Sequence, residues 1–177
     1  MCETNKITKL DAASRHIREA IRMFFEGRDP TVVHTVVSAA TQIVEDLGRH
    51  RGIPASLLDL GVIRKDKEAE FRRLLRAPAN FLKHADSDPD EVFDFRPGIV
   101  PSRIFLAVMF FELVSGSTNR LGREGIVFKS WMILKEPQLF RDGDWTASVR
   151  SAMTIAGADA NNLKLFALLL DEPVPAR

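Results

Sequence analysis

Apolar residues recur every three or four positions along the first part of the chain. In residues 6 to 27 the apolar positions are Ile7, Leu10, Ala13, Ile17, Ile21 and Phe24. Residues 31 to 47 repeat this spacing, and charged or polar residues fill the opposite face of both segments. The pattern predicts two amphipathic helices. Because a few residues around Gly27 join them, we expect an antiparallel hairpin that packs along its apolar stripes.

The middle of the chain is less regular. Residues 53 to 63 favour a short helix or a buried turn, and a third helix is predicted from about Asp66 to Ala85. Pro78 should kink this helix, because proline lacks the backbone donor and its ring clashes with the preceding turn. Residues 86 to 98 hold two prolines and several carboxylates, which is typical of a loop.

The remaining segments are also predicted to be helical. Residues 102 to 116 are apolar on nearly every side, which indicates a buried, central helix. Residues 125–140, 145–156 and 162–170 favour short helices, although 125–134 would also fit a strand. We therefore expect one all-α domain over residues 1–177: an antiparallel helical bundle with a buried central helix and short C-terminal helices.

Composition narrows the functional classes only slightly. Hydrophobic residues make up 45% of the chain, charged residues 28%, and the net charge is +1. Global charge therefore neither favours nor excludes a nucleic-acid partner. The single cysteine excludes an internal disulfide. The first residues lack the apolar core of a signal peptide, and the longest apolar run, residues 104–111, is shorter than the roughly 20 residues that span a bilayer. We expect a cytoplasmic protein without a membrane partner.

A polar stripe on the predicted third helix is the main chemical feature. A helical projection places Phe71, Leu74, Leu75, Pro78, Phe81, Leu82 and Ala85 on one face. The opposite face carries Arg73, Arg76, Asn80 and His84. One interpretation is a solvated helix surface. The other is a site covered by a ligand or a second subunit, because histidine transfers protons near neutral pH and arginine binds phosphate. Such groups can cleave a phosphodiester without metal.

Part of the chain resembles a known family. "AIRMFFEGRDPTVVHTVVSAATQIVEDLGRHRG" (20–52), followed by "NFLKHAD" (80–86), is similar to the HEPN superfamily. The similarity covers residues 6–122 and leaves 123–177 as a C-terminal helical extension. The resemblance implies a small helical domain, commonly a homodimer, and in many members a metal-independent ribonuclease of a toxin or phage-defence system.

The family motif is an arginine and a histidine a few residues apart, often with a polar residue directly after the arginine. His84 matches the histidine and Asn80 the polar residue, whereas Ala79 stands at the position of the arginine. Arg76 lies one residue farther from His84 than the usual limit. The resemblance thus implies a phosphate clamp at Arg76, a positioning group at Asn80 and a proton-transfer group at His84. RNA is the implied substrate.

Further basic residues are candidates for substrate binding. Arg51 belongs to a small basic turn, "GRHRG" (48–52), which together with residues 63–65 and Arg72 and Arg73 would form a phosphate-binding patch. We predict Arg51, Arg73 and Lys83 as the substrate-binding residues.

The acidic loop supports an alternative. Asp86, Asp88 and Asp90 alternate as at the start of a calcium loop, but Glu91 replaces the glycine that such a loop needs. With His84, these carboxylates would suit manganese or magnesium in a metal-dependent hydrolase. We expect no cofactor, with a divalent metal as the alternative. A non-catalytic, dimeric helical interaction module is a further alternative.

Two other residues carry expectations. Glu112 interrupts the apolar run and should either pair with Arg103 or Arg120 or have a raised pKa, because an unpaired buried carboxylate is costly. His34 shares a polar helix face with Ser38 and Glu45, and we expect it to be solvated.

Overall fold

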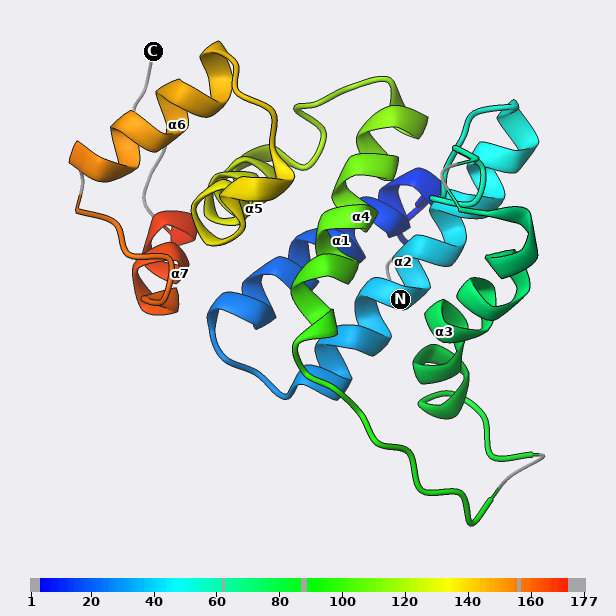
Figure 1. The fold of residues 1–177 in the computed structure, drawn as a ribbon. Coiled ribbons are helices and arrows are strands. Elements are labelled where there is room, and N and C mark those ends of the chain that lie inside the picture. The colour runs from blue at the N-terminus through cyan, green and yellow to red at the C-terminus, as the bar shows by residue number, and fades with distance from the viewer. Residues whose placement is uncertain (1–3, 62, 87–88, 156, 172–177) are drawn as a thin grey trace.

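The protein folds into helices joined by short links (Figure 1). The computed structural model describes residues 4–61, 63–86, 89–155 and 157–171. The helices are α1 (Lys9–Phe25), α2 (Pro30–Arg51), α3 (Glu68–Phe81), α4 (Ile99–Ser115), α5 (Gly122–Lys135), α6 (Asp144–Ile155) and α7 (Leu163–Asp171). Short 3₁₀ turns span Lys65–Lys67 and Pro137–Leu139. The described residues contain no strand, so the all-α prediction is confirmed and the strand alternative for 125–134 is wrong.

The first two helices form the predicted hairpin, and local signals fix its ends. Thr8 caps α1: its hydroxyl accepts from the Asp11 amide, and the Asp11 carboxylate accepts from the Thr8 amide, both at 3.1 Å. Asp29 caps α2 through the Thr31 amide at 2.8 Å, and Pro30 occupies the first turn. Gly52, at φ 67°, ends α2 in a left-handed conformation that suits glycine.

The hydrophobic core lies among α1, α2 and α4, which pack against one another. Each helix contributes small and branched apolar residues: Ala13, Ile17 and Ile21 from α1, Val33, Val37 and Val44 from α2, and Ile104, Val108 and Phe111 from α4. The prediction that α4 is a buried, central helix is confirmed, although one side of the helix stays open. Met109 and Leu113 are 43% and 49% exposed, because nothing among the described residues covers that side of the helix.

The C-terminal helices α5, α6 and α7 form a second group that is joined to the core through α1 (Figure 1). Aromatic rings fill the junction: Phe25 of α1 stacks on Phe166 of α7, and Phe24 contacts Trp131 of α5 edge-on. Beside them the buried carboxylate of Glu124 binds Arg18 at 3.1 Å and Arg22 at 2.8 Å.

Helix α3 is shorter than predicted and differently oriented. It ends at Phe81 rather than Ala85, so His84 lies beyond the helix, although its amide still donates to the Asn80 carbonyl at 3.0 Å. Pro78 is accommodated inside the helix, and the buried residues of α3 are Pro78 and Ala79. Leu74, predicted on the core face, is 57% exposed. Part of the polar face of α3 therefore lies toward α2 and lines the space between the two helices.

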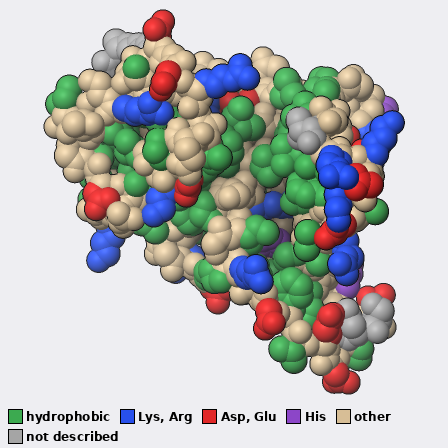
Figure 2. Space-filling view, in the orientation of Figure 1, with side chains coloured by type: hydrophobic (Ala, Val, Ile, Leu, Met, Phe, Trp, Pro, Cys, Tyr) green, Lys and Arg blue, Asp and Glu red, His purple; other side chains and the backbone are tan. Residues whose placement is uncertain are grey.

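The surface carries charges of both signs. Lys and Arg side chains are mixed with Asp and Glu over the face shown in Figure 2, with apolar side chains exposed between them. This fits the small net charge of +1. None of the described helices combines the length and the apolarity that crossing a membrane requires.

A close approach at Gly48 holds the link after α2 against that helix. The Ile53 amide donates to the Gly48 carbonyl at 2.9 Å. A Cβ added at Gly48 would overlap Ala55 and lie 2.8 Å from the Ile53 carbonyl oxygen. We predict that Gly48→Ala lowers the free energy of unfolding by about 1–3 kcal/mol, because the backbone must move. Urea denaturation would measure this loss.

Gly98→Ala is the matched control for this substitution. At Gly98 an added Cβ meets nothing within 4 Å, and φ is −61°, so the change should leave stability nearly unaltered. Equal stability of both variants would show that the link after α2 is free to shift.

Candidate functional site

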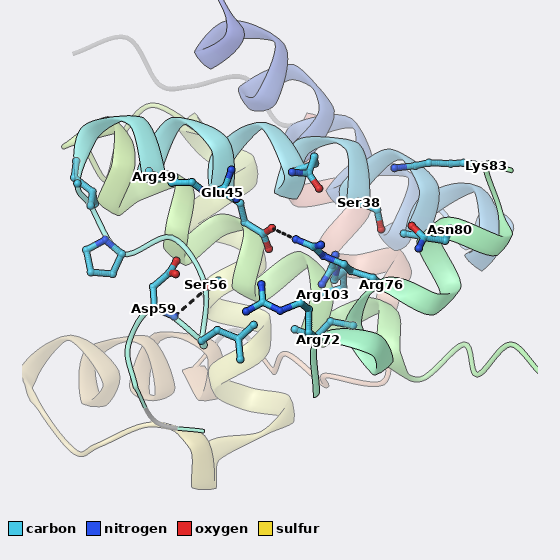
Figure 3. Close-up of a pocket in the computed structure, with 18 residues that line it drawn as sticks. Ser38, Glu45, Arg49, Ser56, Asp59, Arg72, Arg76, Asn80, Lys83 and Arg103 are labelled. Carbon is cyan, nitrogen blue, oxygen red and sulfur yellow. Dashed lines mark hydrogen bonds and ion pairs between the residues drawn. The ribbon is translucent and has the colours of Figure 1, made fainter. Parts of the chain in front are cut away.

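A pocket of about 520 Å³ lies between α2, α3, α4 and the link after α2. Its charged lining consists of five cationic side chains and two carboxylates: Arg49, Arg72, Arg76, Lys83, Arg103, Glu45 and Asp59. Figure 3 shows these side chains converging from the three helices and the link. We call this hollow the arginine pocket. Its volume falls within the range of about 300–1,000 Å³ that is common for small-molecule sites.

Two facing polar stripes build the walls. The α2 wall includes Ser38, Gln42, Glu45 and Arg49, and the opposite wall includes Arg72, Arg76 and Ala79 of α3 and Lys83 of the turn that follows it, together with Asn80. The α2 residues follow an i, i+4, i+7, i+11 spacing and the α3 residues an i, i+4, i+7 spacing, which keeps each set on one helix face. In Figure 3, Asn80 lies near Ser38 and Arg76 points toward Glu45, so the stripes run in opposite directions.

The buried guanidinium of Arg103 is the most unusual group in the pocket. It comes from α4, the core helix, and is 8% exposed. Its Nε atom has no hydrogen-bond partner among the described residues. Burial lowers the pKa of Arg103; Glu45 acts in the opposite direction, and Arg76 adds to the lowering. A buried, incompletely paired cation is costly, and an anion entering the pocket would reduce that cost.

Glu45 is the nearest counter-charge. Its Oε2 atom lies 3.9 Å from Nη2 of Arg76, and its side chain is 19% exposed. Burial raises the pKa of Glu45, and Asp59 adds to the rise, whereas Arg103, Arg76 and Arg49 oppose it. A carboxyl with a raised pKa can exchange protons closer to neutrality than an ordinary glutamate.

Two hydrogen bonds to nearby residues hold Asp59 in place. Its carboxylate accepts from the Ala55 amide at 3.0 Å, and its amide donates to the Ser56 hydroxyl at 3.2 Å. Burial would raise the pKa of Asp59, but hydrogen bonds from Ala55 and Ser56 to the carboxylate, with the charge of Arg49, outweigh burial and leave the pKa below its ordinary value. Asp59 is therefore a fixed negative charge on one wall.

The structure brings some of the predicted site residues together. Arg76, Asn80 and Lys83 line the arginine pocket, whereas His84 is exposed and does not line it. The predicted stripe fails at His84 because α3 ends before that residue. Arg51 donates to the Val114 carbonyl at 2.8 Å at the end of α4, away from the pocket lining.

Arg73 lines a second hollow, of about 500 Å³, on the other side of α3. Arg72, Arg76 and Asn80 line both hollows, so the two are adjacent. Phe81 and Phe93 form part of the second hollow, and their rings are stacked with centroids 5.2 Å apart. We call this space the aromatic hollow.

The alternative metal site is not assembled by the described residues. Asp86 and Asp90 are exposed, and Asp88 lies outside the described part of the chain. Across residues 4–61, 63–86, 89–155 and 157–171, no three His, Cys, Asp or Glu side chains come together as metal ligands.

The expectations for Glu112 and His34 need correction. Glu112 binds Lys129 of α5 at 2.7 Å, whereas Arg120 pairs with Asp11, so the named partners are wrong. His34 is fully buried rather than solvated. Its Nδ1 lies 3.3 Å from the Ser38 hydroxyl, and its Nε2 has no partner among the described residues. The chain between α3 and α4 covers it, through the ring of Phe95.

Sequence reasoning missed Glu45, Arg49 and Arg103 as members of one site. The polar residues of α2 recur at helical spacing, but this pattern was interpreted as a solvated helix face. Arg103 gave no such signal, because it begins an apolar run whose surroundings are set by tertiary packing.

Comparison of the chain with protein-family models, curated proteins and solved structures gave no match. The resemblance to the HEPN superfamily therefore stays a prediction, and the pocket itself is the basis for proposing a function.

The burial of His34 predicts a pH-dependent stability. Burial lowers its pKa from 6.5 to about 4, and the positive charges of Arg103 and Lys83 contribute. Between these values the unfolded chain binds a proton that the folded chain does not. The free energy of unfolding should therefore fall as the pH decreases from about 6.5 to 4, by up to about 1.4 kcal/mol per pH unit.

His34→Gln removes the titrating group but retains a polar side chain beside Ser38. Urea denaturation at several pH values should show a smaller fall in stability for this variant over that window. Parallel pH profiles for the two proteins would contradict the prediction. Comparing them cancels other titrating groups, including Glu45, whose raised pKa acts in the opposite direction.

Proposed function

We propose that the protein binds RNA and that the arginine pocket holds a phosphate group. The observation that carries this proposal is the buried Arg103 guanidinium, whose Nε has no hydrogen-bond partner among the described residues. Arginine presents several N–H donors in a plane and binds phosphate oxygens in pairs. Arg72 and Arg76 extend the cationic surface from the floor of the pocket to its edge.

The balance of charge in the pocket supports an anionic ligand. Five cationic side chains line the pocket beside two carboxylates, although the chain as a whole is almost neutral. Arg49 is paired with Asp46 outside the lining, so Arg72, Arg76, Lys83 and Arg103 remain against Glu45 and Asp59. Positive charge is therefore concentrated where α2, α3 and α4 meet. Phosphate contacts supply most of the sequence-independent affinity of nucleic-acid-binding proteins.

The aromatic hollow favours a nucleic acid over an inorganic anion. It adjoins the arginine pocket through Arg72, Arg76 and Asn80, and it offers the rings of Phe81 and Phe93. Aromatic side chains bind unpaired bases by stacking, and single-stranded RNA leaves its bases free to stack. The HEPN resemblance points to RNA as well, and it implies a homodimer, which size-exclusion chromatography with light scattering would test.

Arg103→Met is the first test of RNA binding. Methionine is apolar and nearly fills the same space, and Glu45 keeps Arg76 as a partner, so we expect thermal stability to change little. The affinity for a short single-stranded RNA should fall about tenfold or more, since charge-assisted hydrogen bonds are lost. Fluorescence anisotropy at fixed salt would measure the affinity.

Arg15→Met serves as the control, because it removes the same charge from an exposed position of α1 outside the pocket. It should change RNA affinity little. If Arg103→Met instead lowered stability and left RNA affinity unchanged, Arg103 would serve the fold rather than a ligand.

A second candidate function is metal-independent RNA cleavage, and the position of Glu45 favours it. A carboxyl with a raised pKa lies within 4 Å of Arg76 in a pocket suited to phosphate. Such a group can accept the proton of a 2′-hydroxyl while arginines stabilise the charge that develops on the phosphate. His84 stays the proton-transfer group that the resemblance implies, although it does not line the pocket.

Cleavage would be tested with labelled RNA, with and without EDTA. We predict that Glu45→Gln lowers the cleavage rate about 100-fold or more, as expected for loss of a general base, and that EDTA has no effect. Loss of activity in His84→Ala but not in Glu45→Gln would return the catalytic role to His84. Activity removed by EDTA and restored by manganese would favour the metal-dependent alternative. RNA binding without cleavage would support the proposed binding function and contradict the proposed cleavage.

A further inference from the structure

The arginine pocket has features that distinguish one kind of phosphate from another. Its most buried cation, Arg103, projects from the core helix α4, whereas Arg72 and Arg76 line the walls from α3. A phosphate that meets all three arginines is therefore bound from both α3 and α4. A phosphodiester inside a strand presents two free oxygens to these arginines, whereas a terminal phosphate presents three.

The carboxylates limit how much nucleic acid the pocket can accept. Glu45 lies on the α2 wall, and Asp59, held negative by its hydrogen bonds, lies on the link. Further phosphates placed along these walls would be repelled. The excess of positive charge is thus available to one group, and a dianion gains more from it than a monoanion does.

We propose that the arginine pocket recognises a terminal phosphomonoester, namely the 5′-phosphate end of single-stranded RNA. This inference rests on the proposed RNA binding and specifies which part of the RNA the pocket takes. It is an alternative to cleavage in the pocket, because a 5′-terminal phosphate has no neighbouring 2′-hydroxyl to attack it. A terminal phosphate has three free oxygens and close to two negative charges at neutral pH, so it can enter end-on and meet several arginines at once.

The aromatic hollow would hold the rest of the nucleotide. Asn80, Arg72 and Arg76 form the boundary between the two hollows. With the 5′-phosphate in the arginine pocket, the first base would lie in the aromatic hollow against Phe81 or Phe93. The remaining strand then leaves across the exposed surface of α3, where Arg73 offers a further phosphate contact.

The test compares two RNA oligonucleotides of one sequence, one with a 5′-phosphate and one with a 5′-hydroxyl, bound to the full-length protein. We expect the phosphorylated strand to bind at least about tenfold more tightly, in keeping with the gain from charge-assisted hydrogen bonds. A 3′-phosphorylated strand of the same sequence tests whether the other terminal phosphate is accepted, and binding as tight as that of the 5′-phosphorylated strand would overturn the assignment to the 5′ end. The 3′-phosphorylated strand should bind like the 5′-hydroxyl strand.

Variants then assign the preference to the pocket. Arg72→Met changes an exposed residue and should reduce the preference without affecting the fold, whereas Arg15→Met should keep it. Adenosine 5′-monophosphate should compete with the strand, more weakly than the strand binds. Tighter binding of the mononucleotide than of the strand would identify a free nucleotide as the ligand and overturn the RNA-end assignment.

Two negative outcomes have different meanings. Equal affinity for the two 5′ ends, with Arg72→Met weakening both, would overturn terminal recognition while RNA binding in the pocket stands. No binding of either strand would overturn the proposed function and this inference together.

Discussion

The buried charge of Arg103 is the constraint on which the arrangement of α2, α3 and α4 around the pocket depends. A guanidinium that projects from the core helix cannot be covered by apolar side chains without a large loss of solvation. The polar stripe of α2 therefore faces it, and Glu45 supplies the nearest carboxylate. Helix α3 lies beside the same region, and its exposed Arg72 and Arg76 line the pocket, which leaves positive charge in excess and an open space instead of a closed ion-pair network.

Buried charge is fully paired at Glu124 in the C-terminal half of the protein and incompletely paired around the arginine pocket. In the C-terminal half, the carboxylate of Glu124 is enclosed, and both Arg18 and Arg22 bind it at close range, so the cluster is complete. It joins α1 to α5 and serves the fold. In the other half, Glu45 and Arg76 stand 3.9 Å apart, and Arg103 has an unpaired Nε among the described residues. An incompletely paired cation of this kind is available to bind an anionic ligand.

The sequence was sufficient for the elements whose signals are local. Apolar periodicity located α1 and α2, although α2 continues past the predicted residue 47 to Arg51, and the apolar run at 102–116 located α4 within a few residues. The orientation of α3 depends on tertiary contacts, because its apolar stripe is short and Pro78 and Ala79 are the residues it buries. Arg76 and Asn80, predicted on one polar stripe, both line the pocket, and so does Lys83, which was predicted separately. His84 was placed on a helix that ends before it. The sequence could not indicate that Glu45 and Arg103 share a site, because the site forms only where α2, α3 and α4 pack together.

The small buried area of α3 has a consequence for motion. A helix that buries two side chains contributes little to the core, so it should separate from α2 at a lower free energy than global unfolding requires. A ligand that contacts Arg76 on α3 and Arg103 on α4 would link the mobile helix to the fixed one. Binding and ordering would then be one event, and part of the intrinsic affinity would be spent on ordering α3.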